Sequence, residues 1–333
     1  MKNFININRI VKNFLIVIIL STSLYGTTDE ILLENSWINI GYSNSKDVMM
    51  SGATTATGKG YSALYTNPAG LATNYAVGIY SHSSYMARKN PTGSLNDENA
   101  LATTKEIEMA DNQAIGVFYK SLILETKPDR SITAGLAYGL ETKYGLFSLG
   151  ANYVKDETTV ENYLDYGTGD YYTLGFQWQK SFIGIDDFYA LYFGYSQKGQ
   201  GVNIIEGEQI GRVSPKVQRI GIGAETNIFT TSLLLSVDMV EQSWNHIDDK
   251  LTTQALGLKW MLWSGFSFAI GASNSIYTTD LNLKDSITLS AGFEFAIWQM
   301  NIGIAVLQKE VKNNAGDVYM RDENAHIDIS FAF

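Results

Sequence analysis

Residues able to carry catalysis are few in this sequence. The 333 residues include three histidines, His82, His246 and His326, and no cysteine. His246 lies beside Asp248 and Asp249 in the polar stretch WNHIDD, and a histidine next to a carboxylate can act as a general base. No further partner accompanies it at a defined spacing, so we interpret this stretch as a solvated loop. The sequence predicts no catalytic site and no bound cofactor, and the protein is not expected to be an enzyme.

Carboxylates form the next group that could do chemistry. Asp280 and Asp285 lie close together in a polar stretch, but their spacing matches no calcium-binding motif, so no metal site is predicted. The net charge of −10 argues against nucleic acid as a partner. The absence of cysteine excludes disulfides and thiol chemistry.

A third group of ionisable residues lies in segments where apolar residues recur at every second position. In the stretch 287–297, Ile, Leu, Ala and Phe alternate with Thr, Ser, Gly and Glu. Successive residues of a strand point to opposite faces, so this pattern predicts a strand with one apolar face. The polar faces of such segments carry Arg219, Glu225, Asp238, Lys259, Glu294, His326 and Asp328.

The length and the second face of these segments indicate a membrane barrel. They run for about 10 to 13 residues, as a tilted strand crossing a bilayer requires. Gly, Ser, Thr, Asn and Gln dominate their polar face, and short turns alternate with longer polar loops. We therefore predict an all-β fold, a transmembrane antiparallel up-and-down β-barrel. On the lipid face an Arg or Lys near the midplane would cost about 2–4 kcal/mol, so the seven ionisable residues are expected in the lumen, pairing with one another or holding a plug.

The number of strands is left open by the pattern. Candidate strands are 75–87, 113–124, 131–141, 144–156, 170–181, 187–199, 216–228, 230–243, 252–263, 265–276, 286–297, 299–310 and 322–333. Bacterial barrels use even numbers. The count becomes fourteen if another strand lies in 31–43 or 88–111, and twelve if residues 27–112 form an enlarged plug region. The acidic segment 97–111 can also be interpreted as a helix outside the wall.

Both ends of the chain carry export signals. Residues 1–26 combine Lys2, Arg9 and Lys12 with the apolar run FLIVIIL, which is typical of a secretory signal peptide. The last residues, HIDISFAF, resemble the signal recognised by the barrel-assembly machinery, with Ile327, Ile329, Phe331 and Phe333 on one face. Outer-membrane lipid and this machinery are the expected partners. Interfacial aromatic belts are expected at Trp178, Trp260, Trp263 and Trp298.

Between these signals lies the stretch 51–72, SGATTATGKGYSALYTNPAGLA, which is built largely of small residues. Such a segment can thread a confined polar space. It ends in Asn67-Pro68-Ala69-Gly70-Leu71, where Asn suits an N-cap, Pro the first helical position and Gly a left-handed exit, so a single tight turn is expected. The candidate plug or gate residues are Gly52, Gly58, Gly60, Asn67, Pro68, Ala69, Gly70 and Leu71.

The run from Ala63 to Leu71 resembles the N-terminal plug of the FadL/TodX long-chain fatty-acid transporter superfamily of outer-membrane barrels, PorV-type members included. The resemblance implies residues 27–74 as a periplasmic segment and lumenal plug, and residues 75–333 as a fourteen-strand barrel. It implies an outer-membrane location in a Gram-negative cell and a plug-gated channel for hydrophobic small molecules. Two alternatives stay open. One is a PorV-like carrier or anchor for secreted cargo proteins, and the other is a structural barrel without a transport role.

Overall fold

The computed structural model describes residues 44–60, 63–73, 78–89, 95–110, 113–124, 127–158, 167–183, 188–199, 216–228, 231–244, 249–263, 265–278, 285–312 and 318–332. Short helices come first: α3 (Ser45–Met49), α4 (Ala63–Thr66) and the 3-10 helix η2 (Pro68–Thr73). The strands that follow are β1 (Gly78–Lys89), β2 (Leu95–Ala110), β3 (Gln113–Leu124), β4 (Lys127–Thr142), β5 (Gly145–Thr158), β6 (Gly167–Ile183), β7 (Phe188–Lys198), β8 (Lys216–Ile228), β9 (Thr231–Trp244), β10 (Asp249–Trp263), β11 (Phe266–Thr278), β12 (Asp285–Ile297), β13 (Met300–Lys312) and β14 (Val318–Ala332). The predicted signal peptide, the segment 27–43, His246, Asp280 and Phe333 lie outside the described residues.

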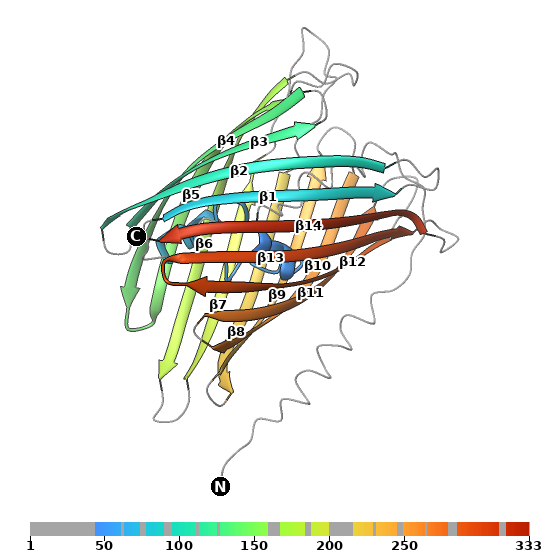
Figure 1. Ribbon diagram of the computed structural model, residues 1–333. Coiled ribbons are helices and arrows are strands. Elements are labelled where there is room, and N and C mark those ends of the chain that lie inside the picture. The colour runs from blue at the N-terminus through green and yellow to red at the C-terminus, as the bar shows by residue number, and fades with distance from the viewer. Residues whose placement is uncertain are drawn as a thin grey trace.

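Each strand pairs antiparallel with the next along the chain, in an up-and-down order (Figure 1). The described strands form a closed barrel in which β1 pairs with β14, from Gly78 opposite Ala332 to Lys89 opposite Arg321. Closure leaves no strand edge with unpaired backbone groups, which hydrocarbon would not tolerate. The all-β, antiparallel, up-and-down prediction is confirmed.

One segment differs from its predicted structure. The stretch 97–111 was expected either to contain a strand or to form a helix outside the wall, and the helical interpretation is wrong. Its residues 97–110 belong to β2, which pairs with β1 on one side and with β3 on the other, and residue 111 lies outside the described residues. Tertiary pairing overrides the local sequence here, because without β2 both neighbouring strands would expose unpaired backbone. β1 and β2 thus occupy the part of the chain that the twelve-strand alternative gave to the plug region.

The two faces of the wall differ as the alternation indicates. In β12, Leu289 is 57% exposed on the outside, whereas its neighbours Thr288 and Ser290 are buried on the inside. The same alternation places Ile222 outside in β8 and Ile327 outside in β14. Aromatic side chains gather on the outer face near the short turns, including Trp260, Trp263, Phe295 and Trp298. The outer face is therefore apolar through the middle of the strands and aromatic at this end.

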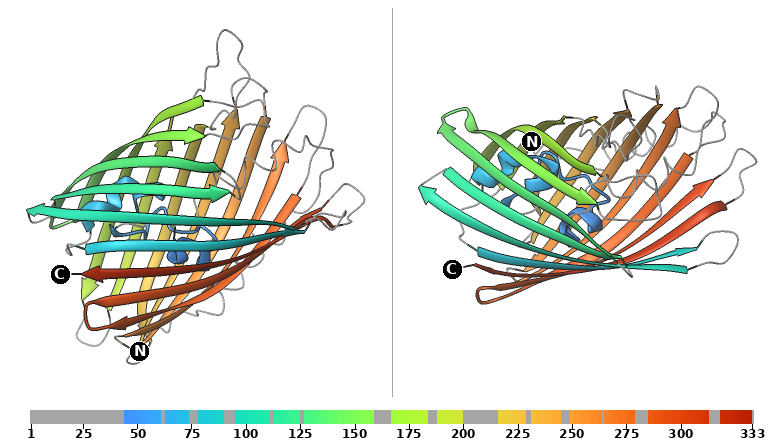
Figure 2. Two further views of the ribbon diagram at one scale, coloured as in Figure 1. Left: turned by 45° about the horizontal axis from the view of Figure 1, so that its top comes forward. Right: turned by 90° about the horizontal axis from the view of Figure 1, so that it is seen from above.

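Connections at the two ends of the barrel differ in length. Short turns join β4 to β5, β8 to β9, and β12 to β13. We call the end of the barrel with these turns the short-turn end. Longer connections, such as those after β5 and after β7, lie at the opposite end. The N-terminal helices lie inside the barrel, surrounded by its strands (Figure 2). Among the described residues, no helix has the length and apolar character needed to cross a membrane.

Candidate functional site

Residues 44–73, which we call the lumenal segment, follow the inner wall rather than crossing the lumen as an isolated thread. Helix α3 contacts β11, β12, β13 and β14, and helix η2 contacts β3, β4, β5 and β6. Between them, Thr55 and Ala56 lie against β7, β8 and β9. The segment therefore meets the strands in the reverse of their chain order, from β13 back to β4.

The leading part of this segment, residues 44–54, is closed on itself around Asp47. Asn44 caps α3 by accepting a hydrogen bond from Asp47 N at 2.9 Å, and its Nδ2 donates back to Asp47 Oδ2 at 2.7 Å. Thr54 Oγ1 donates to the second carboxylate oxygen at 2.7 Å. Ser51 and Gly52 then adopt left-handed conformations, with φ of 50° and 82°. One buried carboxylate thus folds the leading part into a compact unit.

Polar side chains of the wall hold this leading part. Asp328 Oδ2 accepts hydrogen bonds from both N and Oγ of Ser45, each 2.5 Å long. Ser290 Oγ lies 2.7 Å from Ser51 Oγ and donates to the Met49 carbonyl at 3.2 Å. Further contacts come from an ion pair of Lys46 with Glu294, described below. These wall residues belong to two strands, Ser290 and Glu294 to β12 and Asp328 to β14.

The remainder, residues 55–73, is the anchored part, and its hydrogen bonds converge on Thr55. The Thr55 N–H donates to Asp238 Oδ2 at 2.7 Å, and the Thr55 carbonyl accepts from Asn67 Nδ2 at 2.9 Å and Gln177 Nε2 at 3.0 Å. Asn67 Nδ2 also reaches the Phe176 carbonyl at 2.9 Å, and Gln177 Nε2 the Gly58 carbonyl at 3.1 Å. Two amide side chains therefore tie two turns of the segment to β6.

The motif Asn67-Pro68-Ala69-Gly70-Leu71 forms the start of η2. Asn67 Oδ1 accepts from Ala69 N at 3.3 Å, so Asn67 caps the helix that begins at Pro68, as the sequence indicates. The expected left-handed exit at Gly70 is wrong, because positive φ among the segment's glycines occurs at Gly52 and Gly60. Gly70 serves close packing instead, since a Cβ there would lie 2.2 Å from the Gly58 carbonyl oxygen.

Glycines of the wall allow the segment to approach the strand backbone. A Cβ on Gly175 would lie 2.1 Å from Asn67 Oδ1, and one on Gly150 would lie 2.3 Å from the Pro68 carbonyl carbon. Contacts under 3 Å force the neighbours to move. The same close approach to the segment recurs at Gly194, Gly223, Gly257, Gly271, Gly292 and Gly303. Glycine on the inner face therefore marks where the lumenal segment lies.

The charged residues expected in the lumen lie on the inner face of the wall. Arg219, Asp238, His326 and Asp328 are at most 5% exposed. Lys259 forms a hydrogen-bonded ion pair with Glu294, which also accepts from Ser267 Oγ at 3.0 Å and lies 3.6 Å from Lys46 Nζ. Glu225 accepts hydrogen bonds from Tyr192 and Ser232, each 2.6 Å long. Asp238, Asp328 and Glu294 contact the lumenal segment, and Glu225 and Lys259 lie beside a cavity.

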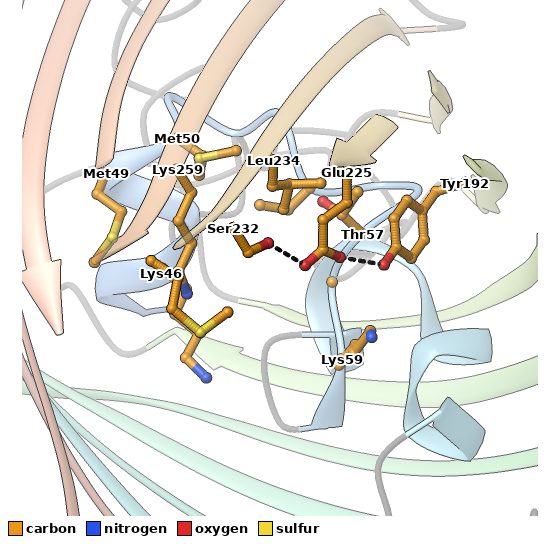
Figure 3. Close-up of a pocket in the computed structure, with 13 residues that line it drawn as sticks. Lys46, Met49, Met50, Thr57, Lys59, Tyr192, Glu225, Ser232, Leu234 and Lys259 are labelled. Carbon is orange, nitrogen blue, oxygen red and sulfur yellow. Dashed lines mark hydrogen bonds between the residues drawn. The ribbon is translucent and has the colours of Figure 1, made fainter. Parts of the chain in front are cut away.

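This cavity, of about 280 Å³, lies between the lumenal segment and strands β7 to β10 (Figure 3). The barrel residues that line it lie near the ends of β8 and β10 and the start of β9, and these positions are close to the short turns. Its lining combines apolar and charged side chains: Lys46, Met49, Met50, Thr54, Thr57, Gly58, Lys59, Tyr192, Glu225, Ser232, Leu234, Lys259 and Met261. Methionines make an adaptable apolar surface. The cavity can therefore hold a small molecule with an apolar body and a polar group.

Lys59 is one of two lysines, with Lys46, that the segment places at this cavity. Its Nζ lies 5.5 Å from the centre of the Tyr192 ring. Its side chain can contact water in the lumen. The surrounding barrel nevertheless shields the ammonium group from most of the bulk solvent. This desolvation lowers the pKa of the ammonium group, and the nearby Glu225 carboxylate opposes the shift.

Several residues that organise the lumen were not singled out from the sequence. Asp47, Gln177 and Ser290 each make two or more of the contacts described above. Gln177 and Ser290 do lie on polar faces of alternating strands, which is a usable signal, but many residues share it. Asp47 precedes the stretch 51–72, and a buried aspartate in a polar run has no distinctive pattern.

Comparison with solved structures finds proteins of similar fold. A Pseudomonas aeruginosa FadL homologue aligns at 9% identity over 87% of this chain and 98% of its own, with a TM-score of 0.50. The Pseudomonas putida toluene transporter TodX aligns at 10% identity over 88% of this chain and 97% of its own, with a TM-score of 0.45. Acinetobacter baumannii outer membrane protein Omp33 aligns at 13% identity over 78% and 98%, with a TM-score of 0.39. The fold thus resembles that of the FadL homologue, and at this identity the likeness concerns the fold alone.

No protein-family model matches the sequence, and no curated protein matches it.

Proposed function

We propose that the chain is an outer-membrane barrel of a Gram-negative cell, built of fourteen strands, that admits hydrophobic small molecules. In this proposal the lumenal segment, residues 44–73, is a plug that gates the lumen. The observation that carries the proposal is the continuous contact of this segment with the inside of a wall whose outside is apolar. An apolar outer face suits lipid, and a polar inner face suits a water-filled passage.

The cavity supports the expected class of cargo. Met49, Met50, Leu234 and Met261 provide an apolar surface inside a polar lumen. Its volume of about 280 Å³ is just below the ~300–1,000 Å³ that is usual for small-molecule pockets. A small molecule with an apolar body and a polar group therefore suits this lining.

The plug is tested by removing part of it. Deleting residues 51–66 takes away Thr55, the centre of the hydrogen bonds that fix the segment, while leaving every strand of the barrel in place. We expect purified protein in planar bilayers to show higher ion conductance than the full chain. Circular dichroism of the variant should keep the β-sheet spectrum of the full chain.

Uptake by cells gives the second readout. The apolar dye N-phenyl-1-naphthylamine fluoresces once it has crossed the outer membrane, and cells producing the full chain should take it up faster than cells without it. Equal dye uptake together with unchanged conductance of the deletion variant would contradict the proposal. Loss of specific surface proteins on deletion of the gene, with unchanged uptake, would favour a PorV-like carrier instead. A PorV-like carrier would use long loops such as 199–216 as its working surface, and this connection lies outside the described residues apart from Gly199 and Lys216.

A further inference from the structure

The cavity beside the lumenal segment brings together lysines from distant parts of the chain. Lys46 comes from α3, Lys59 from the stretch between α3 and α4, and Lys259 from β10 (Figure 3). Among the described residues that line the cavity, Glu225 of β8 is the one carboxylate. These residues therefore contribute three positive charges and one negative charge to a single small space.

The carboxylates near the cavity already accept hydrogen bonds or ion pairs from protein groups. Both oxygens of Glu225 accept hydrogen bonds from hydroxyl groups of the wall. Glu294 of β12 is shared between Lys259 and Lys46. One carboxylate thus serves two ammonium groups, each of which has three N–H donors. The side chains of Lys46 and Lys259 remain 37% and 25% exposed, so both can also donate to a molecule in the cavity.

The electrostatics of Lys59 indicate that this excess of positive charge is unfavourable in the protein alone. Burial is the largest cause that lowers the pKa of its ammonium group, Glu225 raises that pKa, and repulsion from Lys259 and Lys46 lowers it further. A bound anion would offset this repulsion, because an opposite charge nearby favours the charged amine. Its attraction to the lysines would also be stronger than on an open surface, since the barrel excludes part of the water that screens charge.

The rest of the lining limits which anion fits. Met49, Met50 and Leu234 present apolar side chains to the same cavity. Methionine side chains adapt to the shape of the group that they contact. The volume of about 280 Å³ is at the small end of ligand pockets, so the apolar body of the molecule must be short.

We propose that this cavity binds a small organic acid, whose anionic group lies at Lys46, Lys59 and Lys259 and whose apolar body contacts the methionines and Leu234. A neutral molecule of the same size would leave the repulsion between the lysines unrelieved, and a cation would add to it. This inference rests on the proposed function and adds to it the charge and the size of the molecule that the lumen admits.

Three probes of similar size, benzoate, benzyl alcohol and benzylamine, test the preference for an anion. Each is titrated calorimetrically into the purified full chain in detergent, and the heats measured with empty micelles are subtracted. We expect benzoate to bind about tenfold more tightly than benzyl alcohol, which is the effect of about one hydrogen bond to a charged group. Benzylamine should bind most weakly, because the lysines repel it.

Two variants with opposite effects locate the binding. Lys59→Met removes one positive charge and leaves the ion pairs of Glu294 in place, so the affinity for benzoate should fall about tenfold while that for benzyl alcohol changes little. Glu225→Gln removes the negative charge of the lining and keeps its shape, so the affinity for benzoate should rise. Lys143→Met, in the exposed hairpin between β4 and β5, is the matched control and should leave benzoate binding unchanged.

Equal affinity for benzoate and benzyl alcohol would overturn this inference, and so would the absence of benzoate binding or an unchanged affinity in both Lys59→Met and Glu225→Gln. The proposed function would survive each of these results, because dye uptake tests it separately. Cells that take up no dye through the full chain would instead contradict the proposed function, and the titrations would then report a binding site without a transport role.

Discussion

At the residue scale, glycines of the wall let the lumenal segment pack directly against the strand backbone, because they have no side chain. Gly175 and its counterparts on neighbouring strands lie where any Cβ would strike the segment. The alternation of apolar residues with small ones therefore has two physical causes. One is the membrane that we propose surrounds the barrel, and the other is the lumenal segment packed against the inner face.

The first prediction concerns Gly175→Ala. Its new Cβ would lie 2.1 Å from Asn67 Oδ1, so Asn67 must move and lose its bonds to Thr55 and Phe176. Overpacking of this kind costs about 1–3 kcal/mol, and we expect a lower unfolding midpoint in detergent together with a higher conductance. In the control Gly199→Ala, the nearest atom is 3.6 Å away, so stability should change by less than about 0.5 kcal/mol. Equal behaviour of the two variants would argue against close packing of the segment.

A second prediction at this scale concerns the pH dependence of Lys59. Its pKa is lowered in the folded protein, so folding disfavours the charged amine at neutral pH. Stability then rises as pH rises, because the unfolded chain binds more protons than the native one. Lys59→Met should raise the thermal midpoint at pH 7, and its advantage should shrink toward and above pH ~10.4, the ordinary value for lysine. Lys143→Met, in the hairpin between β4 and β5, controls for the loss of one positive charge.

At the element scale, each strand presents one face to the outside of the barrel and one to the lumen. Ile222, in the middle of β8, is 51% exposed on the outside, and Trp298 lies in the turn between β12 and β13. Both side chains are exposed on the outside of the barrel, and the two positions differ in their depth in the proposed membrane.

This difference gives a prediction for lysine at each position. Ile222→Lys should destabilise the barrel by about 2–4 kcal/mol in lipid, because the charge would lie near the bilayer midplane. Trp298→Lys should cost about 0–1 kcal/mol, because that position lies at the interface. Urea unfolding in lipid vesicles measures both. A similar small cost at the two positions would mean that no hydrocarbon layer surrounds β8.

The strands differ in how well they could be predicted from the sequence. Wherever apolar residues alternate strictly, as in β8 and β12, the strand and its outward face could be predicted from the sequence. β2 could not be assigned with the same rule, because its apolar residues do not alternate and its acidic residues also suit a helix. Its structure depends on pairing with β1 and β3, which are distant interactions that a local pattern does not contain.

At the scale of the whole molecule, the path of the lumenal segment depends on the barrel that surrounds it. The sequence indicated a thread of small residues in the lumen, together with the cap at Asn67. It could not indicate the path of that thread along the wall. That path depends on partners such as Asp238, Gln177 and Ser290, which are far away in sequence and become neighbours only when the barrel closes.

The central claim is that the apolar face of this barrel looks toward lipid, and spin labelling tests it most directly. Single cysteines replacing Ile222, Leu289 and Ile327 carry nitroxides in lipid vesicles, and a label at Trp298 reports the interface. We expect labels at the first three positions to collide often with oxygen, which concentrates in hydrocarbon, and rarely with a water-soluble nickel chelate. More frequent collisions with the nickel chelate than with oxygen at these three positions would contradict the account.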